Sequence, residues 1–255
     1  MTLRSIRAIQ GTTLQAIDGP IGWVDHMLFD DVQWTVRYLV ANTGNWLFGR
    51  RVLLSPYAVE AVDWDENNIR LNLTRQQIED SPPLATNQPV SRQFETDFAD
   101  YYRYPIYWGS MGSLEMGAPL ATAEPVPPVT ETDSVPTGDP HLRSTEEVIG
   151  YNIEAHDDDL GHVSDFVVDD ETWVIRYMVV ATRNWLPGKK VLVSPGWISE
   201  VSWLENSVIV DLDKETIKNG PEYDPDALLD REFEATLYQH YGKTTYWEQS
   251  VNQDK

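Results

Sequence analysis

Two pairs of cationic side chains follow a tryptophan and a glycine at the same spacing in two distant segments, NWLFGRRVLLSP and NWLPGKKVLVSP. Paired cations can hold an anion, and a loop tryptophan beside them can anchor a protein partner. However, alternation along a strand sends neighbouring side chains to opposite faces, and the change from Arg to Lys removes a bidentate clamp. We therefore favour solvated cations and a tryptophan that covers its own fold, with a protein- or anion-binding site as the alternative. That candidate site consists of Trp46, Arg50, Arg51, Trp185, Lys189 and Lys190.

Clusters of carboxylates and histidines form the second group with possible chemistry. The pairs Asp30-Asp31 and Asp169-Asp170 supply the oxygen atoms that Ca²⁺ and Mg²⁺ prefer. A third cluster, residues 157–159, lies between His156 and His162, and His26 occupies the related hairpin of the first half. None of these clusters has the alternating spacing of a calcium loop, and Asp is frequent in turns because it bonds its own backbone. We therefore expect turn chemistry and exposed strand ends, and we assign no metal ligand.

Nucleophilic chemistry lacks the neighbours that it needs. The chain has no cysteine, which removes thiolate catalysis and cysteine-bound metals. Ser55 and Ser194 each precede a proline, but no G-x-S-x-G turn surrounds them. Neither a phosphate-binding loop nor a dinucleotide fingerprint follows a strand-like segment. We expect no enzymatic activity and no cofactor.

The charge balance limits the partners. The 255 residues include 41 acidic and 19 basic side chains, which gives a formal net charge of -22. Such a field repels phosphate backbones and anionic lipids at long range. The N-terminal segment has no apolar core of signal-peptide length, and no run of roughly 18 apolar residues occurs. We expect a soluble, cytoplasmic protein that neither binds nucleic acid nor inserts into a membrane.

The chain is a duplication. An offset of 139 positions aligns residues 3–108 with 142–247 without a gap, and about 36 of the 106 aligned positions are identical. Between the copies, residues 109–141 are rich in proline and poor in large apolar groups, which predicts a flexible linker. We therefore expect two domains, residues 3–108 and 142–247, each able to adjust its placement relative to the other.

Each copy carries dense strand signals. The first reads TLQAID, GWVDHMLFD, WTVRYLVA, RVLLSP, VEAVDWD and IRLNL, separated by turn residues, and the second copy repeats the series. Alternation places Trp34, Val36, Tyr38 and Val40 on one face, so Trp34 and its counterpart Trp173 are predicted core residues. About six short strands with hairpin-type turns predict a mainly β fold, a small antiparallel barrel in each copy.

Helix signals follow each predicted barrel. Thr74 and Gln77 form a capping box, and Asp213 stands at the equivalent place of the second copy. A longer helix then begins near Ser91 or Asp230, with an apolar stripe every three to four residues. We expect this stripe to pack on its own barrel or on the other copy.

Each copy resembles the PRC-barrel domain family, named for the soluble part of the photosynthetic reaction-centre H subunit. The likeness is carried by DGPIGWVDHMLFDDVQWTVRYLVANTGNWLFGRRVLLSP and DDDLGHVSDFVVDDETWVIRYMVVATRNWLPGKKVLVSP, in which D-x-x-x-G-x-V, an acidic turn, W-x-x-R-Y and Ser-Pro follow one order. It covers roughly residues 3–82 and 142–221. The resemblance implies two tandem six-stranded barrels, a role in protein assembly or adaptation, and no common catalytic site.

Our leading hypothesis is a non-enzymatic scaffold or adaptor. Its two repeats would self-associate or bind a protein partner through loop aromatics and the Tyr/Trp-rich C-terminal helices, and linkage of two modules raises avidity. The alternative is a ligand- or metal-binding regulatory module with its site near Trp46 and Trp185. A weaker alternative is an RNA-processing or ribosome-associated factor, which the acidic charge opposes.

Overall fold

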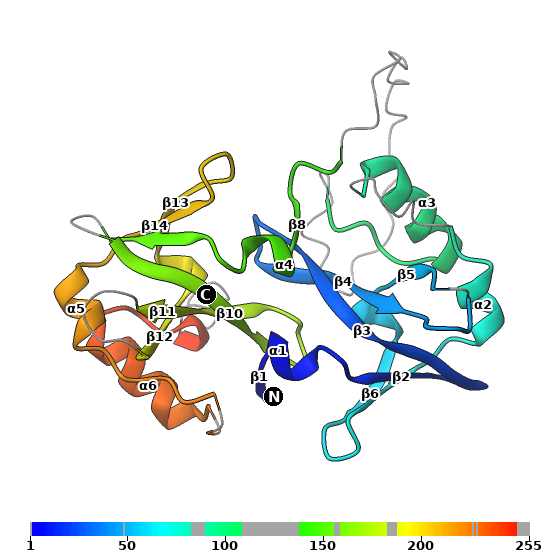
Figure 1. Ribbon diagram of the computed structural model, residues 1–255, viewed down its shortest axis with the longest axis horizontal. Coiled ribbons are helices and arrows are strands. Elements are labelled where there is room, and N and C mark those ends of the chain that lie inside the picture. The colour runs from blue at the N-terminus through cyan, green and yellow to red at the C-terminus, as the bar shows by residue number, and fades with distance from the viewer. Residues whose placement is uncertain are drawn as a thin grey trace, which may run out of the picture.

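The computed structural model describes residues 2–47, 49–82, 90–108, 138–155, 159–182, 188–225, 227 and 229–248. The predicted linker, apart from residues 138–141, lies outside the described residues. In the described part the fold is mainly β, with two sheets of seven strands and few helices (Figure 1).

Each repeat supplies six strands to its own sheet, at the places where the sequence predicted them. The first sheet has the order β5-β4-β3-β2-β7-β6, with β2 (Thr13–Ala16), β3 (Gly19–Asp30), β4 (Thr35–Asn42), β5 (Arg51–Leu54), β6 (Val59–Asp63) and β7 (Asn68–Leu71). The second has the order β12-β11-β10-β9-β14-β13, with β9 (Asn152–Glu154), β10 (Asp159–Asp169), β11 (Ile175–Thr182), β12 (Lys190–Val193), β13 (Ile198–Ser202) and β14 (Ser207–Val210).

The sheets differ from the predicted antiparallel barrels in two respects. β2 pairs with β7, and β9 with β14, in parallel orientation. In each sheet the last strand of the repeat therefore runs in the same direction as the first of its six strands. Over the described residues each sheet is also open, since its two outermost strands, β5 and β6 or β12 and β13, share no ladder. The prediction of purely antiparallel sheets was therefore wrong.

Each repeat gives its seventh strand to the other repeat. β1 (Leu3–Ser5) pairs antiparallel with β10 at residues 167–169, and β8 (Leu142–Ser144) pairs antiparallel with β3 at residues 28–30. Figure 1 shows the N-terminal strand, together with α1 (Ile6–Ile9), beside β10, and α4 (Thr145–Val148) beside β3 at the centre of the molecule. The two ends of the exchange are related by the same 139-residue offset as the sequence repeat.

The length of β3 explains the exchange. Residues 19–23 of β3 pair with β2, which is too short to continue along that edge. Residues 28–30 would thus present unpaired backbone groups on that edge, and β8 satisfies them. Side chains fix the register, because Ser5 Oγ donates to Asp165 Oδ2 at 2.5 Å and the Met27 N–H donates to Thr145 Oγ1 at 3.2 Å.

The two repeats meet through a reciprocal pair of backbone bonds. Val36 N donates to Trp173 O at 2.9 Å, and Ile175 N donates to Trp34 O at 2.7 Å. One cluster of buried apolar residues runs through both repeats. The packing of the repeats, which the sequence left open, thus gives one pseudo-symmetric body.

Alternation along β4 is interrupted at Arg37. Phe29 pairs with Val36 and Leu28 with Tyr38, so Arg37 is an extra residue of the kind found in a β-bulge. Val36 therefore joins the main core, whereas Tyr38 packs in a second cluster under the C-terminal helix. The predicted single face for Val36 and Tyr38 was wrong, because a bulge exchanges the faces.

Trp34 and Trp173 precede their strands rather than lying within them. Both have a left-handed backbone, with φ of 51° and 60°, as the last residue of the acidic turn. Trp173 is buried, which confirms its predicted place in the core. Trp34 is only half-buried and stacks on Phe29 with the ring centroids 5.3 Å apart.

The helices follow the capping signals. α2 (Arg75–Glu79) begins with the predicted capping box, whereas Asp213 makes no side-chain cap bond before α5 (Lys214–Lys218). α3 (Arg92–Tyr102) and α6 (Arg231–His240) begin at the predicted caps Ser91 and Asp230. α3 packs on its own sheet, where Phe98 meets Tyr38 edge to face at 5.3 Å. Among the described residues, no helix is both long and apolar enough to cross a membrane.

Candidate functional site

The first cation of each pair binds the end of a short helix. Arg50 donates to the carbonyl oxygens of Glu79 and Ser81 at 3.0 and 2.8 Å. In the second repeat Lys189 Nζ donates to the equivalent carbonyl oxygens, those of Lys218 and Gly220, each at 2.8 Å. These carbonyls have no intrahelical donor and carry partial negative charge. Either cation can supply two donors, so the exchange of Arg for Lys between the copies preserves this contact.

The other members of the predicted set lie apart from these contacts. Arg51 forms an ion pair with Asp25 at 3.0 Å, and Lys190 begins β12. Trp46 packs against the core and lies under the Arg75 guanidinium, 4.6 Å from the ring centroid. Trp185 lies outside the described residues. The paired cations thus point to different partners, and a binding role for Trp46 stays a prediction.

The first aspartate of each acidic turn organises the turn itself, as predicted. Asp30 Oδ1 accepts the N–H groups of Val32 and Gln33, and its Oδ2 pairs with Arg37 at 2.8 Å. Asp169 makes the same three contacts in the second repeat, with Arg176 at 3.1 Å. The turn chemistry therefore recurs in both copies.

The second aspartate of each turn reaches across the repeat boundary. Asp170 Oδ2 accepts a hydrogen bond from Trp64 Nε1 at 3.0 Å, and Asp31 Oδ2 accepts one from Arg143 Nε at 3.1 Å. Sequence reasoning missed this role, because it depends on the exchanged placement of the repeats.

One histidine reaches an acidic turn, His141, whose Nδ1 lies 3.0 Å from Asp31 Oδ1. His26 lies 3.2 Å from Asp25 and 3.5 Å from Glu146, His162 is half-buried on β10, and His156 is outside the described residues. No group of three His, Asp or Glu side chains with metal-binding geometry occurs in the part of the chain that the structure describes.

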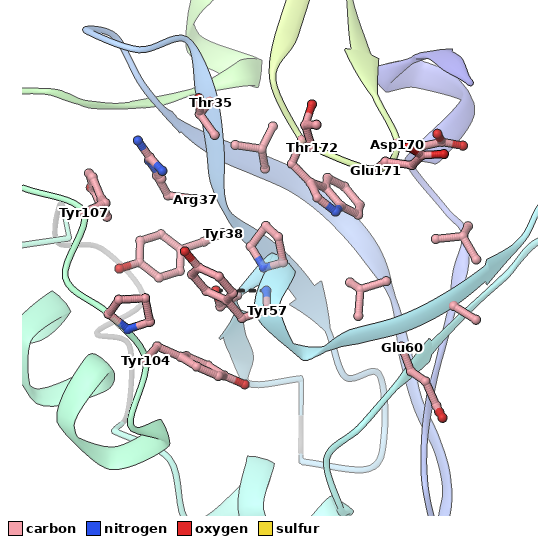
Figure 2. Close-up of a pocket in the computed structure, with 18 of the residues that line it drawn as sticks. Thr35, Arg37, Tyr38, Tyr57, Glu60, Tyr104, Tyr107, Asp170, Glu171 and Thr172 are labelled. Carbon is pink, nitrogen blue, oxygen red and sulfur yellow. Dashed lines mark hydrogen bonds between the residues drawn. The ribbon is translucent and has the colours of Figure 1, made fainter. Parts of the chain in front are cut away.

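A cavity of about 570 Å³, here called groove 1, opens where β4, β6 and the end of α3 face the acidic turn of the second repeat. Its volume lies in the range typical of ligand sites. Figure 2 shows Tyr38, Tyr57 and Tyr104 on one side and Asp170, Glu171 and Thr172 on the opposite side. The aromatic residues of its lining are Tyr38, Tyr57, Trp64, Phe98, Tyr104, Tyr107, Trp108 and Trp173.

A second cavity of about 660 Å³, groove 2, occupies the equivalent place on the second repeat. Arg176, Ser194 and Tyr246 line it where Arg37, Ser55 and Tyr107 line groove 1. The duplication therefore produced two related depressions at the repeat boundary, and neither was predicted from the sequence.

Behind each groove lies a buried carboxyl group held by two tyrosines. Glu95 Oε2 accepts hydrogen bonds from Tyr38 at 3.0 Å and Tyr107 at 2.6 Å. In the second repeat Glu234 Oε1 accepts from Tyr177 at 2.7 Å and Tyr246 at 3.1 Å. Both glutamates are almost fully buried, at 0% and 1% exposure. These bonds fix the C-terminal segment that forms one wall of each groove.

The guanidinium groups complete this wall. Arg37 lies over the Tyr107 ring at 4.1 Å, and Arg176 over the Tyr246 ring at 4.2 Å. Since Asp30 and Asp169 hold these two guanidinium groups, each acidic turn is linked to the C-terminal segment through an arginine and a tyrosine.

A second buried carboxylate, that of Asp139, adjoins Glu95. Asp139, just before β8, accepts a weak bond from Tyr107 at 3.4 Å and pairs with Arg92 at 2.9 Å. Burial raises the pKa of Glu95 to about 8, and the adjacent Asp139 contributes to the same rise. Burial and Glu95 likewise raise the pKa of Tyr38 and Tyr107. Glu95 is thus largely protonated at neutral pH.

The self-alignment contains the signal for this network, although the predictions above did not use it. Glu95 and Glu234 are identical residues beside the apolar stripe of the predicted helix. The tyrosines that contact them, and the arginines that lie over Tyr107 and Tyr246, are also identical between the repeats. A charged residue repeated beside an apolar stripe indicates a partnered, buried group.

Comparison with known families supports the resemblance. The model of the PRC-barrel domain matches residues 142–217. This segment is similar to a PRC-barrel domain. A search of curated proteins gave no match to the chain.

The PRC-barrel match covers β8 through most of α5 and stops before α6. Glu234 and Tyr246 therefore lie beyond the matched segment, in the C-terminal part of the repeat that forms one wall of groove 2. The first repeat shares the same strands, acidic turn and Ser-Pro element at an offset of 139 residues. Groove 2 thus combines strands of the matched segment with a helix outside it, α6, which contributes Tyr238.

Proposed function

We propose that this protein is a non-catalytic protein-interaction scaffold built from two PRC-type barrel repeats. PRC-barrel domains commonly mediate protein contacts, and the second repeat matches that family. Strand exchange joins the two repeats, so a partner at their boundary contacts both of them.

The observation that carries this proposal is the aromatic groove at the repeat boundary. Tyr57 is 60% exposed at its mouth, and Trp64 and Tyr104 are half-buried in its wall. Partly exposed aromatic rings around a depression are typical of protein-binding hot spots. Each repeat contributes residues to groove 1, so the site requires the duplicated chain.

The serines beside the grooves support a binding role rather than catalysis. Ser55 Oγ accepts the Tyr57 N–H at 3.3 Å, and Ser194 Oγ accepts the Gly196 N–H at 3.4 Å. These bonds begin the 3-10 turns η1 (Pro56–Ala58) and η2 (Pro195–Trp197). In this interpretation both hydroxyls are helix caps, as the Ser-Pro order favours.

A small-molecule regulatory site is the second candidate, because the volume of groove 1 suits a small ligand. A thermal-shift screen over metal ions, phosphates, nucleotides and organic amines separates the two readings. A melting shift of several degrees with one of these compounds, in the absence of any protein partner, favours the regulatory site. The net charge of -22 gives an RNA role little support.

Site-specific photo-crosslinking on the full chain tests the scaffold proposal. A photoreactive phenylalanine analogue at Tyr57 should capture a protein in native extract, whereas the same group at Leu204, which is 94% exposed on the β13–β14 hairpin, should not. Light scattering should show whether that protein is a second copy of the chain. Absence of any protein adduct from Tyr57, together with a strict monomer, contradicts the proposal.

A further inference from the structure

The two grooves differ in the charged side chains that line them. Among its described lining residues, groove 1 has three carboxylates, Glu60, Asp170 and Glu171, and one cation, Arg37. Groove 2 has two cations, Arg176 and Lys243, and no carboxylate among its described lining residues. The difference arises from substitution between the repeats, because Ser199 and Val32 stand where groove 1 has Glu60 and Glu171.

Arg37 does not pair with Glu60 or Asp170 in the described contacts. Arg37 is already paired with Asp30 and also donates to Gln33 Oε1 at 2.6 Å. Asp170, by contrast, accepts only neutral donors in the described contacts, the Trp64 indole and the Thr2 N–H. A cationic group entering the groove therefore finds an attractive field beside aromatic faces, which also favour cations.

An unpaired strand edge forms the floor of the same groove. Ala61 and Val62 of β6, which follow a register shift at Glu60, both line it, although successive side chains of a strand point to opposite faces. The groove must therefore meet β6 along its backbone edge. Within the described residues β6 forms a ladder only with β7, so this edge has backbone donors and acceptors available to an added strand.

Groove 1 has a small side chain at a position where groove 2 has a tyrosine. Ala99 lines groove 1, whereas the equivalent Tyr238 is a buried ring that packs against Trp197, with centroids 5.2 Å apart. At this position groove 1 is lined by a methyl group rather than by a phenol ring.

We propose that groove 1 binds an extended segment of a partner protein that carries lysine or arginine, laid as an added strand along β6. This inference rests on the scaffold function proposed above and specifies its partner. Backbone bonds to β6 supply the alignment, the aromatic wall covers the aliphatic stems, and Asp170 and Glu60 face the cationic heads.

Selection from a phage-displayed library of random octapeptides on the full chain tests this. The selected peptides should be enriched in Lys and Arg alternating with apolar residues. Synthetic copies should bind in fluorescence anisotropy, and their charge-reversed versions should not. Binding should also weaken with added salt.

Repeat-matched variants locate the binding. Ala99→Tyr copies the residue that fills groove 2, and it should weaken binding by about tenfold or more, the effect of roughly 1.4 kcal/mol. Glu60→Ser copies Ser199 and should weaken it by about two- to fivefold, as expected for one exposed ion pair. Ser199→Ala, on the other repeat, should leave binding unchanged.

Several outcomes overturn the inference. Enrichment of neutral or acidic peptides contradicts the charge argument, and binding that survives Ala99→Tyr contradicts the location. If arginine amide alone raises the melting temperature as much as a selected peptide does, the ligand of groove 1 is a small cation rather than a peptide. A protein adduct at Tyr57 combined with any of these results leaves the scaffold function standing and removes only the partner class.

Discussion

The indole of Trp64 in the first repeat donates a hydrogen bond to Asp170 of the second, 3.0 Å from Nε1 to Oδ2. Arg4, on the exchanged strand β1, lies over the same ring at 5.0 Å. Trp64 thus contacts both the acidic turn and the strand that the first repeat gives to the second sheet. Because it also lines groove 1, the boundary between the repeats and the candidate binding site share one side chain.

Replacing Trp64 by phenylalanine should therefore destabilise the chain by about 1–2 kcal/mol, since a half-buried carboxylate loses its donor. The free energy of unfolding in urea measures this. Trp203→Phe is the matched control, because Trp203 lies under Arg143 at 4.1 Å and has no indole bond among the described contacts. An equal loss in both variants would assign the effect to the ring rather than to the hydrogen bond.

The exchanged segment should stabilise the repeat that it does not belong to in sequence. Ile6 is fully buried and follows β1, so Ile6→Ala should cost about 2–4 kcal/mol. Hydrogen exchange measured by mass spectrometry should show that the backbone amides of β10, which α1 contacts, exchange faster in this variant than in the wild type. Thr145→Val is the reciprocal variant, and it should loosen β3, where its hydroxyl accepts the Met27 N–H. Faster hydrogen exchange confined to the repeat that carries the substitution would contradict the swapped placement of β1 and β8.

The buried Glu95 should make stability fall as the pH rises. Its pKa is raised from 4.5 to about 8, so the folded state binds this proton more tightly than the unfolded state. The contribution is fully present below about pH 4.5 and is lost as the pH rises through 8, by at most about 1.4 kcal/mol per unit. Urea unfolding of the wild type and Glu95→Gln from pH 5 to 9 isolates it, because the glutamine does not titrate.

Glu95→Gln should show a flatter stability curve than the wild type over that range. Asp139→Asn offers a control, because it removes a neighbouring charge that raises the pKa of Glu95, so the decline should end at a lower pH. Parallel wild-type and Glu95→Gln curves would contradict the assignment.

The cation at position 50 should behave as a helix cap. Arg50→Lys should be nearly neutral, because Lys189 makes both equivalent bonds with one ammonium group. Arg50→Met should cost about 1 kcal/mol, since two carbonyl oxygens lose a charged donor at a partly exposed site. Thermal unfolding measures both, and Lys189→Met should reproduce the loss in the second repeat. An equal cost for Arg50→Lys and Arg50→Met would contradict the capping role.

The sequence by itself determined the features that depend on local order. The duplication, the positions of the strands, the Thr74 capping box and the acidic turns all rest on neighbouring residues, whose hydrogen bonds and alternation are fixed within a few positions. The PRC-barrel resemblance rests on the same local elements, and residues 142–217 match the family.

Tertiary structure decided everything that depends on residues far apart. The bulge at Arg37 changed the faces of β4, and the open edge of β3 recruited β8 from the other repeat. Arg50 became a cap only because α2 ends beside it, and Glu95 was buried only because two tyrosines reach it from distant segments. Neither repeat alone contains groove 1, because strand pairing across the chain places Asp170 opposite β6.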